Sequence, residues 1–128
     1  MKLSEYFEGT AGTGVLSTAD TAGKVDAAIY ARPHFIDEDT IAFIMADKMT
    51  HANLQTNPYA VYLFKEKDSY EGRRLYLRKI DEEKDTPLID QLRRSSRTAA
   101  GHDNGNSSSR FLLRFKIDKV RPLTGDGN

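Results

Sequence analysis

The sequence contains no cysteine. That absence excludes disulfide bonds, thiolate catalysis, zinc sites with cysteine ligands and cysteine-ligated iron–sulfur clusters. No run approaches the ~18 consecutive apolar residues of a membrane-spanning helix, and the first eight residues lack the apolar stretch of a secretory signal. We therefore expect a cytoplasmic protein that does not enter the membrane.

Several sequence motifs of enzymes and of metal sites are also missing. There is no G-x-S-x-G elbow, and His51 and His102 stand far apart without a paired serine or cysteine motif. The glycines of residues 9–14 are spaced G-x-x-G-x-G and lead into a strand-like run, so they do not form a dinucleotide loop. The acids at 37–39 beside His34 lack calcium-loop spacing. The glycine run and the acidic cluster are best interpreted as turns, and the two histidines as ordinary residues of no special role, so we predict no metal site.

Length and composition favour one soluble globular domain spanning residues 1–128. The chain has 38% hydrophobic and 30% charged residues, and two separate cores in 128 residues would each be too small. Its net charge is zero, but residues 1–70 hold 6 basic and 10 acidic side chains and residues 71–128 hold 13 and 9. The basic half is compatible with an anionic ligand, an acidic partner subunit or a solvated mixed surface. No nucleic-acid-binding module fits the pattern, so we expect no nucleic acid partner.

Short runs rich in β-branched and aromatic residues predict six strands. Turns at 20–24 and 37–39 predict that the first three strands form consecutive antiparallel hairpins. Two helices are predicted at 50–56 and 86–94, and the small polar residues of 98–109 predict a mobile loop. The expected fold is mainly β or α+β, a small antiparallel barrel with short helices at its rims. The predicted strands are 14–18, 25–31, 40–45, 60–64, 73–78 and 111–117.

The segment 47–58 is the most informative stretch for function. It lies where a strand ends and a helix begins, and Thr50 is a plausible N-cap. Exposed amides, the helix dipole, a hydroxyl and Lys48 could therefore converge on one phosphate. The alternative is an ordinary capped helix that connects two strands.

The ordered set of segments in this chain resembles the flavin mononucleotide (FMN)-binding split-barrel family, which includes the pyridoxamine 5'-phosphate oxidases. The resemblance covers most of the chain and is best from about Tyr6 to Glu66. It rests on Gly14-Val15-Leu16-Ser17-Thr18, Val25 to Arg32, Thr40 to Ala46, and Ala52-Asn53-Leu54-x-x-Asn57-Pro58-Tyr59-Ala60-Val61.

The resemblance implies a six-stranded, Greek-key-like split barrel that binds FMN at the interface of a homodimer. It implies that one strand runs past the isoalloxazine ring, with its backbone at the polar edge of the ring. It also implies that a strand-to-helix junction grips the phosphate, with an asparagine nearby on the helix. The strand residues are Ala28, Ile29, Tyr30, Ala31 and Arg32; the junction residues are Ala46, Asp47, Lys48, Met49 and Thr50; the asparagine is Asn53.

One position departs from the family pattern. Family members commonly carry a lysine or arginine where this chain has Met49 or Thr50. Three explanations stay open: Lys48 substitutes, Arg32 or an arginine of the partner supplies the charge, or the site holds FMN weakly. The longer C-terminal region that binds the substrate phosphate in pyridoxamine 5'-phosphate oxidases is not found.

We therefore expect a homodimeric FMN-dependent oxidoreductase that acts on a small molecule or redox partner. Its catalytic residues are not identifiable, because a flavin carries the redox chemistry itself. The alternative is a non-catalytic split-barrel module that binds haem, a deazaflavin or another ligand.

Overall fold

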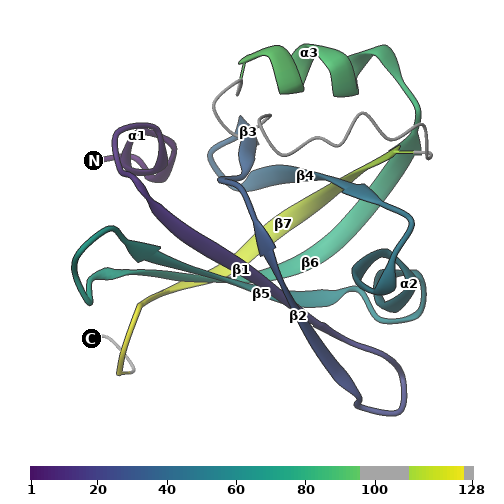
Figure 1. Cartoon of the computed structure of the whole chain (residues 1–128), viewed down its shortest axis with the longest axis horizontal. Helices are drawn as coiled ribbons and strands as arrows, with labels where there is room; N and C mark the ends of the chain where they lie inside the picture. Colours follow the sequence, from purple (N-terminus) through teal and green to yellow (C-terminus); the bar gives the residue numbers. More distant parts are fainter. Residues whose placement is uncertain (96–109, 126–128) are drawn as a thin grey trace.

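The computed structural model describes residues 1–95 and 110–125 (Figure 1). The predicted loop at 98–109 therefore lies outside the described residues. The strands form one antiparallel sheet with the order β2-β1-β5-β6-β7-β4-β3. The elements are α1 (Leu3–Glu8), β1 (Gly12–Ala19), β2 (Val25–Tyr30), β3 (His34–Asp37), β4 (Thr40–Ala46), α2 (Met49–Thr56), β5 (Tyr59–Glu66), β6 (Gly72–Lys84), α3 (Pro87–Ser95) and β7 (Arg110–Pro122).

The predicted class, an antiparallel barrel with short helices, is confirmed, but the described sheet has seven strands rather than six. The extra strand is β3, and it forms the hairpin with β4 that we assigned to β2. The predicted pairing of β2 with β4 is wrong, because β2 pairs with β1 and is the terminal strand of the sheet. Residues 31–33 then carry the chain from one end of the sheet to the other.

Alternating side chains on the long strands build the barrel interior. Along β1 and β5, every second residue is buried, which is the pattern of a sheet with one face on the core. Tyr62 is fully buried, and its hydroxyl donates to the backbone oxygens of Tyr30 and Ala31 at 3.2 and 3.0 Å. A side chain at Gly14 would overlap the Tyr62 ring, so this ring requires glycine on the facing strand. The core therefore fixes the end of β2 as well as its own packing.

Two of the helices close the barrel. The α1 helix, which the sequence did not indicate, inserts Phe7 (2% exposed) against Phe64, with ring centroids 5.0 Å apart. The α3 helix buries Ile89 in a second cluster with Ala42 and Leu112, as its apolar spacing predicted. In Figure 1, α1 lies near the start of β1, and α2 lies toward the opposite end of β1 and β5.

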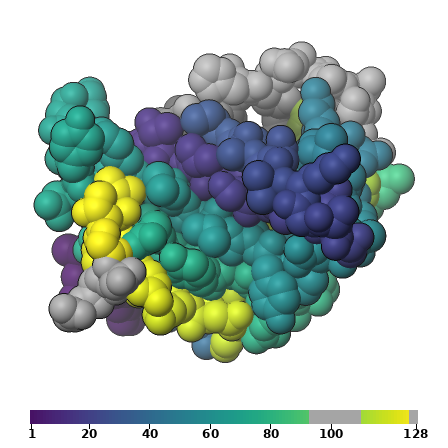
Figure 2. Space-filling view, turned by 90° about the horizontal axis from the view of Figure 1, so that it is seen from below, coloured from purple at the N-terminus to yellow at the C-terminus, as the bar shows by residue number. Residues whose placement is uncertain are grey.

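The face of β2, β1, β5 and β6 that points away from the barrel interior carries several apolar side chains. Ile29 stands opposite Val15, which stands opposite Leu63, and Val61 stands opposite Tyr76 in the next row. Ile29 is 72% exposed. Figure 2 shows these four strands together with β7 on the underside of the molecule. We call Val15, Ile29, Val61, Leu63 and Tyr76 the outer face.

Candidate functional site

The junction between β4 and α2 forms a tight turn that leads into the first turn of the helix. The Lys48 amide donates to the Ala46 oxygen at 2.9 Å, and the helix begins at Met49. The predicted N-cap at Thr50 is wrong, because Lys48 occupies the cap position and its side chain caps no amide. The side chains of Asp47, Lys48 and Met49 are exposed around this helix start.

Thr50 instead faces inward and meets β2. It is 4% exposed and is hydrogen-bonded to the hydroxyl of Tyr30. The Tyr30 ring packs edge-on against Phe43 of β4, with centroids 5.8 Å apart. Burial raises the pKa of Tyr30, and the hydrogen bond with Thr50 acts against that shift. The structure therefore brings together Tyr30 and Thr50, two of the predicted site residues that are 20 positions apart.

The β2 strand offers an open backbone edge. On one side Ala28, Ile29 and Tyr30 pair with Leu16, Val15 and Gly14 of β1, and among the described residues no strand pairs with the other side. An edge strand presents amide and carbonyl groups in alternation. Because α2 packs against β1, β2 and β4, this open edge and the helix start belong to one region of the molecule.

Arg32 is directed away from that junction. Its Nη1 donates to the backbone oxygens of Phe7 and Glu8 at the end of α1, at 2.8 and 3.2 Å. With Ala31 and residues 8–12 it lines a cavity of about 500 Å³. The expectation that Arg32 supplies the phosphate charge therefore has no support within one chain.

Asn53 lies on the buried side of α2. It is 5% exposed, and its Nδ2 donates to the Thr18 hydroxyl of β1 at 3.0 Å. This hydrogen bond ties the helix to the barrel. The exposed cation nearest in sequence to the helix start is Lys48.

The sequence interpretation missed a charged network around His51, which we had treated as a histidine of no special role. The His51 ring is 6% exposed and stacks on Phe111 with centroids 3.8 Å apart. Its Nδ1 lies 3.1 Å from Asp47 Oδ1, and its Nε2 lies 3.1 Å from Glu82 Oε2. The other carboxylate oxygen of Glu82 accepts from Lys79 at 2.6 Å and from Gln55 at 2.9 Å. The network joins the β4–α2 junction to β6.

Glu82 is held in its charged form by these neighbours. Burial favours the neutral carboxyl, but hydrogen bonds from Gln55, Lys79 and His51 outweigh it and lower the pKa of Glu82 to about 2. Because the folded pKa lies below the ordinary value, the charged group stabilises the folded state above about pH 4.5. That stabilisation is lost as the pH falls toward the folded pKa.

We predict that Glu82→Gln lowers the free energy of unfolding by about 2 kcal/mol at neutral pH. The deficit should shrink below about pH 4.5 and vanish near about pH 2, as measured by urea denaturation across a pH series. Glu71→Gln, on the exposed turn before β6, is the matched control. A deficit for Glu82→Gln that stays constant with pH would contradict this account.

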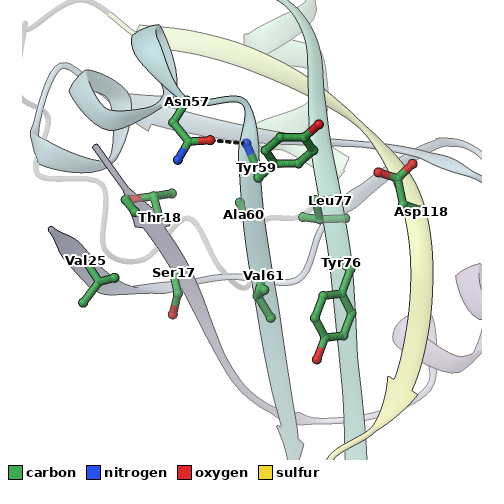
Figure 3. A pocket seen from close by; sticks show the side chains of 11 residues that line it. Ser17, Thr18, Val25, Asn57, Tyr59, Ala60, Val61, Tyr76, Leu77 and Asp118 are labelled. Atoms are coloured by element: carbon green, nitrogen blue, oxygen red, sulfur yellow. Dashed lines mark hydrogen bonds between the residues drawn. The ribbon is translucent and has the colours of Figure 1, made fainter. Parts of the chain in front are cut away.

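A second cavity of about 330 Å³ opens on the outer face, where Val61 and Tyr76 form part of its lining (Figure 3). Ser17, Val61 and Tyr76 lie across neighbouring strands, and Thr18 and Tyr59 stand beside them. The amide of Tyr59 donates to Asn57 Oδ1 at 3.1 Å. The lining of neither cavity includes the junction residues 46–50.

Two further classes of feature are absent from the described chain. Among residues 1–95 and 110–125, no three histidine, aspartate or glutamate side chains are grouped so that they could hold a metal ion. No helix in the same ranges has the length and apolar character needed to cross a membrane.

Comparison with known proteins places the fold. No family model and no curated protein matches the sequence. Among solved structures, an FMN-binding protein from Syntrophomonas wolfei subsp. wolfei is 24% identical, with a TM-score of 0.78 over 97% of this chain and 85% of that one. HutZ, the haem storage protein of Vibrio cholerae, is 17% identical with a TM-score of 0.69 over 98% and 94%. An F420 reductase is 12% identical with a TM-score of 0.73 over 91% and 94%. The structural neighbours are therefore FMN-binding split-barrel and pyridoxamine 5'-phosphate oxidase-like proteins, and the chain has the split-barrel fold that the sequence resemblance predicted.

Proposed function

We propose that this chain is an FMN-binding flavoprotein of the pyridoxamine 5'-phosphate oxidase-like kind that works as a homodimer on a small molecule. The observation that carries the proposal is the open edge of β2 beside the start of α2. A flavin needs both features, because its ring has a polar edge and its ribityl chain ends in a phosphate. The similarity to the FMN-binding protein of Syntrophomonas wolfei supports the same ligand.

The ring would lie along residues 28–32. The pyrimidine edge of the isoalloxazine alternates hydrogen-bond acceptors and a donor, and the free edge of a strand offers the complementary alternation. Ile29 projects from the outer face and would cover part of the ring. Arg32 would stay with α1, since its guanidinium already donates to two carbonyls there.

The phosphate would lie at residues 46–50. The first amides of a helix lack partners within the helix, and no side chain caps those of α2. Lys48 would add a positive charge. The Thr50 hydroxyl would give up its hydrogen bond with Tyr30 and form one with the phosphate instead. Asn53 would not contact the ligand; it would act indirectly, by holding α2 against Thr18 of β1. Of the three explanations for the missing family cation, this arrangement favours substitution by Lys48.

A second copy of the chain would pack on the outer face. Val15, Ile29, Val61, Leu63 and Tyr76 form an apolar patch, bordered by Ser17 and Arg74, on a sheet face that reaches β2, the proposed ring site. Apolar patches of this kind on a small domain mark interaction surfaces. Because the same strand borders both features, the partner would close the ring pocket, and each site would contain residues of two chains.

Bound FMN would supply electron or hydride transfer to the small molecule or redox partner. The residues of the chain would position the ring and exclude water. No side chain is assigned as an acid or base.

A second candidate function is the binding of haem or a deazaflavin without catalysis. The similarity to the haem storage protein HutZ and to an F420 reductase favours it. His51 would not serve as a haem ligand, because both its ring nitrogens face carboxylates.

The test is the visible absorption spectrum after purification and FMN supplementation, with excess cofactor removed on a sizing column. A two-banded flavin spectrum that elutes with a dimer supports the proposal. A colourless protein that takes up haem with a Soret band would replace it with the second candidate.

A further inference from the structure

The two ring nitrogens of His51 face acceptors on opposite sides. Asp47 Oδ1 and Glu82 Oε2 each lie 3.1 Å away. A carboxylate can only accept a hydrogen bond, so both contacts are satisfied only when both ring nitrogens carry protons. Gln55 Nε2 also lies 3.0 Å from His51 Nε2, but it has partners for its own protons in Glu82 Oε1 and the His51 carbonyl.

The two carboxylates are held very differently. Glu82 is fixed by Lys79 and Gln55. Asp47 is 70% exposed and lies at the β4–α2 junction, where His51 is the partner of its carboxylate. When the ring loses one proton, the remaining proton stays at Nε2 toward the fixed Glu82. Nδ1 then presents a lone pair to Asp47, and the exposed carboxylate moves away from it.

We propose that His51 is a positioning residue that sets the conformation of the β4–α2 junction, and thereby its affinity for a phosphate group, according to whether the ring is protonated. The identity of the ligand rests on the proposed function. The coupling between the protonation of His51 and the conformation of the junction rests only on the contacts of the described chain.

The other groups around the ring support this assignment. From β6, Lys79 neutralises Glu82, and Lys84 lies 5.9 Å from the Phe111 ring centroid. From β7, Phe111 stacks on the imidazole. The junction contributes Asp47. When the ring is protonated, it attracts Asp47 and neutralises the charge of that carboxylate. When the ring is neutral, the Asp47 carboxylate is released beside Lys48, and it competes with the phosphate for the Lys48 ammonium group.

The first experiment uses the full chain without ligand. Nuclear magnetic resonance follows the His51 ring and the backbone amides of residues 47–50 across a pH series that spans the protonation of the ring. The junction amides should shift with the same midpoint as the ring. In Asp47→Asn, the side-chain amide can accept from the protonated Nδ1 through its oxygen and donate to the neutral Nδ1 through its nitrogen, so the junction amides should stop following the ring. His34→Gln removes the other described histidine and should leave the coupling unchanged.

The second experiment measures FMN dissociation constants in the same proteins by fluorescence quenching. The wild-type constant should rise about fivefold from about pH 6 to about pH 8.5. The FMN phosphate gains charge over this range and would change affinity in the opposite sense. Asp47→Asn and His51→Gln should abolish the rise.

The outcomes separate the two ideas. If the junction amides ignore the titration of His51, or if both variants keep the wild-type pH dependence, the inference is wrong. If the amides follow the ring but FMN binds at no pH, the positioning role stands and the proposed function fails.

Discussion

Lys48→Ala should weaken FMN binding about 10- to 100-fold, because it removes an exposed positive charge that the junction offers to the phosphate. Thr50→Val should weaken binding by a similar or smaller factor, by removing a hydroxyl contact of ~1 to 3 kcal/mol. Both constants are measured by titrating flavin fluorescence. The two effects should be close to additive if each side chain contacts a different phosphate oxygen.

Two controls separate phosphate binding from general damage. Lys67→Ala removes an exposed lysine on the turn between β5 and β6, so it should leave FMN affinity unchanged. Tyr30→Phe removes the hydroxyl that Thr50 contacts in the ligand-free chain. If Tyr30→Phe weakens binding as much as Thr50→Val does, then Thr50 acts by supporting β2. Unchanged affinity in both Lys48→Ala and Thr50→Val would place the phosphate elsewhere.

Val15→Glu should convert the dimer to a monomer and abolish FMN retention on a sizing column. Val15 stands between Ile29 and Leu63 on the outer face, and a carboxylate buried there without a partner costs about 3 to 5 kcal/mol. The dissociation constant of the dimer should therefore rise by about 100-fold or more, as measured by sedimentation equilibrium. The monomer should stay folded, because Val15 alternates with the buried residues of β1 and points away from the barrel interior.

Ile36→Glu is the matched control for that experiment. Ile36 is an exposed apolar residue of β3, at the opposite end of the sheet from β2. The variant should remain dimeric and retain flavin. A Val15→Glu protein that stays dimeric would move the interface to another surface, and a wild-type monomer with bound FMN would remove the two-chain site altogether.

The sequence was a good guide where local pattern decides structure. Runs of β-branched and aromatic residues located six of the seven described strands; five of the six contain buried side chains, and β2 alternates exposed with partly buried ones. It failed at β3, whose four residues follow Pro33 and mix polar with apolar side chains. The predicted end of β6 was also six residues too early, because residues 79–84 are mostly charged. Those residues are strand because β7 pairs with them, and a partner 30 residues away leaves no local signal.

The candidate site shows the same division. The β4–α2 junction was predictable, because a strand signal gives way to a helix signal there. The direction of the Arg32 side chain was not predictable, because its acceptors are carbonyls of α1. That helix, at residues 3–8, is too short to give a helical pattern in the sequence. The partnership of His51 with Glu82 depends on where β6 crosses α2, which no spacing in the sequence encodes.

The place of β7 in the sheet has a consequence for how the chain folds. The β3–β4 hairpin is joined to the rest of the sheet only through β7 among the described strands, with Ile44 opposite Leu112 and Leu77 opposite Ile117. During synthesis, the first four strands cannot complete the barrel until the segment at 110–122 has left the ribosome. Closure therefore depends on contacts far apart along the chain, which slow folding, and until then β4 has an exposed edge that is open to wrong partners.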